Sequence, residues 1–170
     1  MNEHDFELDR FQAKHAARYR KFLVVVDDSP ECQLAIRFAC GRAAHTIGGR
    51  LLLFHCVRPG EFQHWMGVAD RMREEARAET EALMRAVADE VYRHVGLYSE
   101  IVIAEGEAKE ELMAVLQQDT DIFVLILGAH PTDDPGPLVR HFTGAVAGRL
   151  PCPVVIVPGA MTMERIDAMV

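Results

Sequence analysis

Two stretches that follow apolar runs carry the residues best suited to hold a ligand. Asp27-Asp28 comes directly after the apolar run Lys21–Val26, and Gly128 ends a second such run. The loop behind it, Ala129–Pro137, contains three prolines, two aspartates and Gly136. A glycine between a strand and a helix is typical of phosphate-binding loops, in which backbone N–H groups face the anion. Proline lacks that donor, and aspartate repels phosphate. The loop therefore supports an α/β architecture more strongly than it supports nucleotide binding.

The same loop has two interpretations, which the sequence leaves open. Asp133-Asp134 stands just before an expected helix, where acidic groups face the positive end of the helix dipole. In one interpretation the helix supplies its own anion. In the other, Gly136 and the cationic side chains of His130, Arg140 and His141 form an anion or nucleotide site at the helix N-terminus.

Other chemically active groups give weaker signals. The four cysteines form no CxxC pair, which favours reduced thiols that pack as small apolar side chains. No two histidines have metal-ligand spacing, and no nucleophile motif is present. His55 lies in an apolar strand and is expected to be a hydrogen-bonded core residue. Asp27 and Asp28 could act as paired carboxylates, but without a supporting group we expect no catalytic residue and no metal site.

Apolar runs and helical patterns alternate along the chain. Strands are expected at 21–26, 51–57, 99–104, 123–127 and 154–157, with the third nearer an edge. Helices are expected from Ser29 to the Gly48-Gly49 break, over about 68–94, 107–118 and 137–150, and as one or two turns within 161–170. The long helix should bury one face: Ala69, Met72, Ala76, Leu83, Val87 and Val91. This order predicts a doubly wound, five-stranded parallel sheet with helices on both faces.

A sheet of this kind binds ligands outside the carboxyl ends of its strands, where the strand order reverses. If the first and fourth strands are central neighbours, Asp27-Asp28 and Gly128-Ala129 bracket a crevice there. The end of the second strand, Cys56-Val57, lies beside it.

Length and composition restrict the class of protein. A chain of 170 residues fits one domain, and we divide it into an arm (1–20), a domain (21–158) and a tail (159–170). The net charge of −8 argues against nucleic acid or an anionic membrane as a partner. No apolar run reaches the roughly 18 residues of a membrane span, and the acidic N-terminal stretch lacks the order of a signal peptide. We therefore expect a cytoplasmic protein.

Four segments resemble the universal stress protein family over roughly residues 20 to 158: Val24–Ser29, Leu53–Val57, Leu125–Gly128 and Pro151–Val157. The closing Pro-Cys-Pro-Val-Val is the most specific part. The resemblance implies a Rossmann-like, adenine nucleotide alpha hydrolase-like fold with strand order 3-2-1-4-5. It also implies that Asp27 contacts a ribose and that Cys56 lies beside the base.

Family members that bind ATP resemble one another in a Gly-x-x-Gly, nine residues, Gly-Ser/Thr pattern after the fourth strand. Gly128 fits the first glycine, but the second falls on Pro131, and the final pair falls on His141 and Phe142. The triphosphate half of the site does not match, so we expect no tightly bound cofactor and at most weak binding of ATP or another adenine nucleotide. The candidate binding residues are Val26, Asp27, Cys56, Gly128, Ala129, Gly136 and His141.

The resemblance, together with the mismatched triphosphate loop, implies a non-enzymatic stress-response or regulatory homodimer. The alternative is an ATP-binding member with slow hydrolysis, its ligand held by Asp27, Cys56, Gly128 and the 131–142 loop. The last strand, Pro153–Val157, is apolar and uncharged, and at a sheet edge a bare strand of this kind templates aggregation. We expect it to pair with the same strand of a second copy about a two-fold axis, as the resemblance also suggests. Other protein partners are possible.

Overall fold

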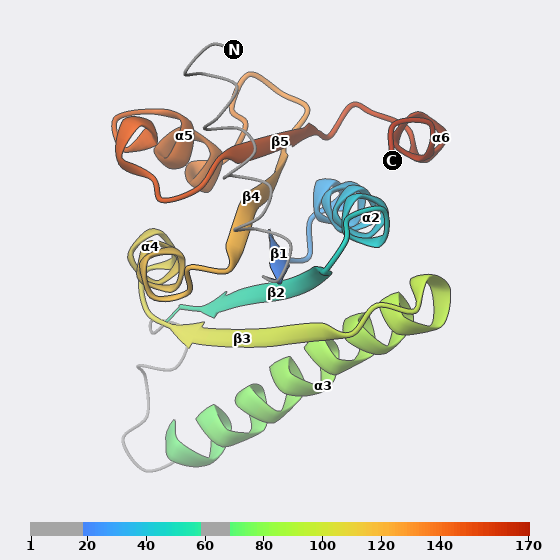
Figure 1. Ribbon diagram of the computed structural model, residues 1–170. Coiled ribbons are helices and arrows are strands. Elements are labelled where there is room, and N and C mark those ends of the chain that lie inside the picture. Colours follow the sequence, from blue (N-terminus) through green and yellow to red (C-terminus); the bar gives the residue numbers. More distant parts are fainter. Residues whose placement is uncertain (1–18, 59–68) are drawn as a thin grey trace, which may run out of the picture.

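Five parallel strands form one sheet between two layers of helices in the computed structural model, which describes residues 19–58 and 69–170 (Figure 1). The strands are β1 (Arg20–Val25), β2 (Gly49–Val57), β3 (Ser99–Glu105), β4 (Ile122–Ala129) and β5 (Val154–Pro158). Their order across the sheet is β3-β2-β1-β4-β5, and every neighbouring pair is parallel. The predicted doubly wound sheet, its order and its edge position for the third strand are confirmed.

Helices cover both faces of the sheet, as predicted. On one face lie α2 (Pro30–Ala44), α3 (Ala69–Val95) and the short α6 (Met163–Asp167). On the other face lie α4 (Ala108–Gln118), α5 (Pro137–Thr143) and the single 3₁₀ turn η2 (Ala147–Arg149). Strand residues alternate between the layers: Val24 packs on the α2 side and Leu23 on the α4 side, and both are fully buried. Burial on both faces explains why the central strands are apolar throughout.

The turn between β1 and α2 has a serine N-cap followed by a proline. Ser29 is the N-cap, and its Oγ accepts a hydrogen bond from the Cys32 backbone N–H at 3.3 Å. Pro30 occupies the first helical position, where its missing N–H costs nothing. This turn places the first residues of α2, including Glu31, beside the carboxyl ends of β1 and β4.

Three boundary or packing predictions need correction. The helix expected over 137–150 ends at Thr143, because Gly144 interrupts it: a Cβ at that position would lie 2.7 Å from the Arg140 carbonyl oxygen. On α3, Val91 is buried and Val87 packs on the core, as predicted, but Leu83 is 47% exposed and its neighbour Met84 is fully buried in its place. The first strand begins at Arg20, inside the segment assigned to the arm.

Some predictions fall outside the described residues. They concern residues 1–18 of the arm, the break at Pro59-Gly60, the helix start at Val68, and the side chains of Ala69 and Met72. The tail forms the expected short helix, α6, which packs on α2. There Ile166 is fully buried, and Asp167 pairs with Arg37.

Candidate functional site

A crevice of about 280 Å³ lies at the carboxyl ends of β1, β2 and β4, between the starts of α2, α4 and α5. This is where the strand order reverses, because β1 continues to β2 on one side and to β4 on the other. Polar groups and main chain from these ends line it: Asp27, Ser29, Glu31, Cys32, His55, Cys56, Arg58, Glu107, Lys109, Gly128 and Gly136. Five of the seven predicted binding residues therefore come together here, namely Val26, Asp27, Cys56, Gly128 and Gly136.

Asp27 lies at the tip of β1 with an exposed side chain. Its Oδ1 accepts hydrogen bonds from the Ser29 backbone N–H at 2.9 Å and from the Ser29 hydroxyl at 2.5 Å. Its own N–H donates to Cys32 Sγ at 3.3 Å. No described residue donates to Oδ2. Ser29 thus fixes the carboxylate through Oδ1, and Oδ2 can accept hydrogen bonds from hydroxyl groups in the crevice.

The end of β2 supplies a mixed polar and sulfur surface. His55 Nδ1 lies 2.8 Å from the Val26 carbonyl oxygen, and because a carbonyl only accepts, Nδ1 must carry the proton. In the neutral ring Nε2 is then an acceptor. His55 is hydrogen-bonded, as predicted, but it is half-buried and lines the crevice rather than lying in the core. Burial raises the pKa of the Cys56 thiol, whose Sγ is 3.5 Å from the Gly106 carbonyl oxygen, so this thiol stays protonated.

Gly128 allows β4 to end in contact with α2. A Cβ at this position would lie 2.7 Å from the Glu31 carbonyl oxygen and 3.1 Å from Glu31 Cγ, so only glycine fits. Ala129, the next residue, is buried, and its carbonyl accepts the Gly159 N–H at 2.7 Å. It does not contribute to the lining of the crevice.

The loop after β4 satisfies its own polar groups. The His130 N–H donates to the Pro135 carbonyl at 3.2 Å, and the Gly136 N–H donates to Asp134 Oδ1 at 3.0 Å. The same carboxylate contacts Arg140 at 2.6 Å. The Gly136 N–H and the Arg140 guanidinium together hold the pKa of Asp134 below its usual value. This arrangement supports the interpretation in which the helix supplies its own anion.

His141 lies apart from the other candidates. It lines a separate open groove between α4 and the α5–η2 segment. Its neighbour Phe142, which the family spacing assigns to a hydroxyl residue, is fully buried under the sheet. A glycine followed by a small residue, Gly144-Ala145, occurs after α5 has ended, but neither residue lines the crevice.

Sequence reasoning missed four charged residues of the crevice: Glu31, Arg58, Glu107 and Lys109. Arg58 follows the second strand directly, and Lys109 lies in the first turn of α4, so their positions at strand and helix ends were a usable signal. Glu31 has the sequence position of an ordinary acidic residue in the first turn of a helix. Its burial depends on a contact with β4 that no local pattern reveals.

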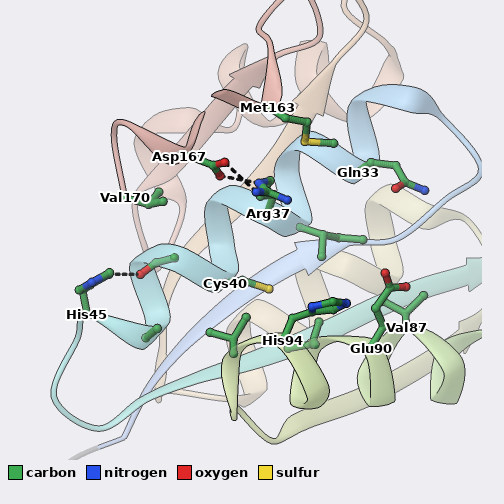
Figure 2. A pocket seen from close by; sticks show the side chains of 15 residues that line it. Gln33, Arg37, Cys40, His45, Val87, Glu90, His94, Met163, Asp167 and Val170 are labelled. Carbon is green, nitrogen blue, oxygen red and sulfur yellow. Dashed lines mark hydrogen bonds and ion pairs between the residues drawn. The ribbon is translucent and has the colours of Figure 1, made fainter. Parts of the chain in front are cut away.

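A second, larger cavity of about 520 Å³ lies between α2, α3 and α6, away from the strand ends (Figure 2). Arg37 of α2 and Asp167 of α6 both line it and form a two-pronged ion pair, with N–O distances of 2.5 and 2.7 Å. Val170 packs against Gly41, where a Cβ would collide with it at 2.3 Å. The tail thus closes part of this cavity. The crevice at the strand ends is the better candidate because it gathers polar groups from three strands at the reversal point.

Residues 19–58 and 69–170 contain neither a cluster of metal ligands nor a helix suited to cross a membrane. No group of three or more histidine, cysteine or acidic side chains in these ranges is arranged to hold a metal ion. Within the same ranges, no helix combines the length and apolar character that would let it cross a membrane.

Solved structures share this fold. Universal stress protein UspA from Lactobacillus plantarum is 22% identical, with a TM-score of 0.65 and coverage of 83% of this chain and 99% of that one. A universal stress protein family protein from Arabidopsis thaliana, solved with AMP bound, is 16% identical, with a TM-score of 0.56 and coverage of 86% and 94%. The universal stress protein from Archaeoglobus fulgidus in complex with dAMP is 19% identical, with a TM-score of 0.52 and coverage of 81% and 97%.

These low identities show a common fold and no more. None of the curated proteins matches the chain. The model of the universal stress protein family, however, matches residues 18–158, which is most of the sequence. The chain therefore belongs to the universal stress protein family.

Proposed function

We propose that this chain is a non-enzymatic, cytoplasmic universal stress protein that holds the adenosine part of an adenine nucleotide weakly in the crevice and acts as a homodimer in stress response or regulation. The observation that carries the proposal is the contrast between the two ends of the crevice. The end formed by β1 and β2 offers groups to a nucleoside, whereas the loop after β4 binds its own carboxylate. Relatives of the same fold were solved with AMP and with dAMP, which supports an adenine ligand.

The nucleoside end has suitable chemistry. Asp27 Oδ2 is an acceptor for ribose hydroxyl groups, and its partner oxygen is already held by Ser29. His55 Nε2 and the half-buried surface of Cys56 lie on the β2 side, where a base with an exocyclic amine would find an acceptor and a polarizable contact. Together they form the mixture of apolar surface and few directed polar groups that small-molecule sites use.

The phosphate end argues against the slow-hydrolysis alternative. The Gly136 N–H, the best-placed donor at the start of α5, already donates to Asp134. Arg140, in α5, is paired with that same carboxylate. A triphosphate would have to displace Asp134 from both, so binding tight enough for productive ATP turnover is not supported.

ATP should bind with a dissociation constant no better than about 100 μM, or roughly −5.5 kcal/mol. The reason is the engaged loop together with Pro131, which offers no N–H to a phosphate. Isothermal titration calorimetry of the purified full chain measures this directly. Low-micromolar affinity would contradict the prediction.

Asp27→Ala should weaken adenosine binding about fivefold, because a lost ribose hydrogen bond costs about 1 kcal/mol. The matched control is Asp28→Ala, which removes the same charge from the next residue; that residue does not line the crevice. Calorimetry on both variants and the unmodified protein gives the comparison. Equal affinities of all three proteins for adenosine would place the ligand elsewhere.

The homodimer and compartment parts of the proposal have separate support. β5 pairs with β4 alone in the described sheet, so its outer edge is open to a second copy. All four cysteines are free thiols, and burial raises the pKa of both Cys32 and Cys40 to about 11. Such inert buried thiols suit a reducing compartment.

A further inference from the structure

The second cavity, between α2, α3 and α6, takes no part in the proposed nucleoside site. Its volume of about 520 Å³ lies within the roughly 300–1,000 Å³ that small-molecule pockets span. The second cavity and the crevice share no lining residue, although α2 contributes to both. A ligand could therefore occupy the second cavity while the crevice holds a nucleoside.

Much of the lining of the second cavity is apolar. Cys40 of α2 and Val91 of α3 belong to it and are buried. Burial raises the pKa of the Cys40 thiol to about 11, so this side chain is neutral and offers a polarizable surface. Val95 and Met163 also line the cavity, yet both are exposed. A ligand with a hydrocarbon part would remove these apolar side chains from water.

The polar groups of the lining are mainly acceptors. Arg37 already donates from Nε and Nη2 to the two carboxylate oxygens of Asp167, which neutralises its charge. His45 Nδ1 lies 2.8 Å from the Gly41 carbonyl oxygen, so Nδ1 carries the proton and Nε2 of the neutral ring is an acceptor. A ligand that donates hydrogen bonds therefore suits this lining better than one that accepts them.

Glu90 gives the lining a charge without a counter-charge. On the same helix Glu81 pairs with Arg77 and Arg85 at 3.3 and 3.5 Å, whereas no described residue pairs with Glu90. Figure 2 shows Glu90 and His94 extending from α3 towards α2. The lining thus contains two carboxylates, of Glu90 and Asp167, and one guanidinium. Such a surface attracts a cation and repels an anion.

We infer that the second cavity binds a small hydrophobic amine, whose hydrocarbon part packs against the apolar lining and whose ammonium group faces Glu90. The apolar side chains select for the hydrocarbon part, and the acceptor-rich polar groups select for the charge. This site is independent of the proposed nucleoside site, because the two share no residue.

Three ligands with the same alkyl chain test the inference: octylamine, octanol and octanoate. At about pH 8 they are cationic, neutral and anionic. NMR titration of the isotope-labelled full chain gives both the affinities and the residues whose signals shift. We expect the signals of lining residues to shift, and octylamine to bind at least about fivefold more tightly than octanoate, with octanol between them. The ratio is modest because Glu90 is exposed and water screens its charge.

Glu90→Gln keeps the shape of the side chain and removes its charge. It should reduce the ratio of octylamine affinity to octanoate affinity at least about threefold. The matched control is Glu79→Gln, the same change at an exposed residue of α3 that does not line the cavity. It should leave the ratio unchanged.

A second pair of variants tests the apolar part of the site. Val95→Asp puts a charge into the apolar lining, one helical turn beyond Val91, and should weaken octanol binding at least about threefold. Leu83→Asp makes the same change at an exposed residue of α3 outside the lining and should not alter it. Both positions are exposed, so neither variant removes a buried side chain.

Four outcomes would overturn the inference. In the first, none of the three ligands shifts the signals of lining residues at millimolar concentration. In the second, octanoate binds as tightly as octylamine. In the third, Glu79→Gln changes the affinity ratio as much as Glu90→Gln, which would reduce the preference to net charge. In the fourth, Val95→Asp leaves octanol binding unchanged. The proposed nucleoside site would survive each of them, because these ligands carry no base or ribose.

Discussion

Val155→Lys should convert the proposed homodimer to a monomer at micromolar concentration. β5 forms one edge of the sheet, and its side chains extend both hydrophobic layers to that edge: Val155 on the α2 side, Val154 and Ile156 on the α4 side. A second copy that adds its own β5 about a two-fold axis would continue both layers and satisfy the open backbone groups. A lysine at position 155 would bring two ammonium groups together near that axis. We expect the dimer dissociation constant to rise at least about 100-fold, or roughly 2.7 kcal/mol.

Sedimentation velocity over a range of concentrations measures this change. Val155→Thr, which keeps nearly the same side-chain shape, should remain dimeric. Ile47→Lys controls for the added charge, because it places a lysine on another surface, at an apolar residue that is 86% exposed. Circular dichroism should show that each variant is folded. The interface would be refuted by an unmodified protein that sediments as a monomer. In that case the β5 edge would need another cover. The C-terminal tail does not supply it, because α6 packs on α2.

The architecture could be predicted because the elements have strong local signals. The central strands are continuous apolar runs. Ser29-Pro30 is a typical helix start, and in the structure Ser29 caps α2 and Pro30 is its first residue. The order of the strands needed the family resemblance, since periodicity alone does not say which strands are neighbours. The crevice then followed, because the carboxyl ends of adjacent parallel strands must lie at the same edge of the sheet.

The errors have physical causes that a single sequence does not reveal. Leu83 and Met84 both lie near the apolar stripe of α3, and only the packing against the sheet decides that Met84 is the buried one. Glu31 has the pattern of an acid at a helix N-terminus, but the close approach of Gly128 and Gly159 buries it. The spacing of the ATP-binding pattern made His141 a candidate, but the structure places His141 in a separate groove, and it buries Phe142, the other residue of that pair, in the core.

Phe142→Ser should lower the free energy of unfolding by about 3–5 kcal/mol, the loss typical of a large aromatic removed from a core. Phe142 is fully buried, and α5 has only seven residues, too few to be stable without packing, so its position depends on this side chain. His141→Ser introduces the same residue at the neighbouring, half-buried position and should lower the free energy of unfolding far less. Urea denaturation gives the values. All variants are measured at one protein concentration, because the proposed dimerisation would make stability depend on concentration.

Phe142→Ser also tests whether position 142 corresponds to the hydroxyl residue of the ATP-binding pattern, as the residue spacing implies. Phe142→Ser introduces a hydroxyl residue where that pattern has one, so a role in phosphate binding predicts a gain in ATP affinity. We expect no gain, because the side chain at this position points into the layer between α5 and the sheet and not into the crevice. A loss of stability below about 1 kcal/mol, or a tenfold gain in ATP affinity by calorimetry, would show that residue 142 serves the ligand rather than the core.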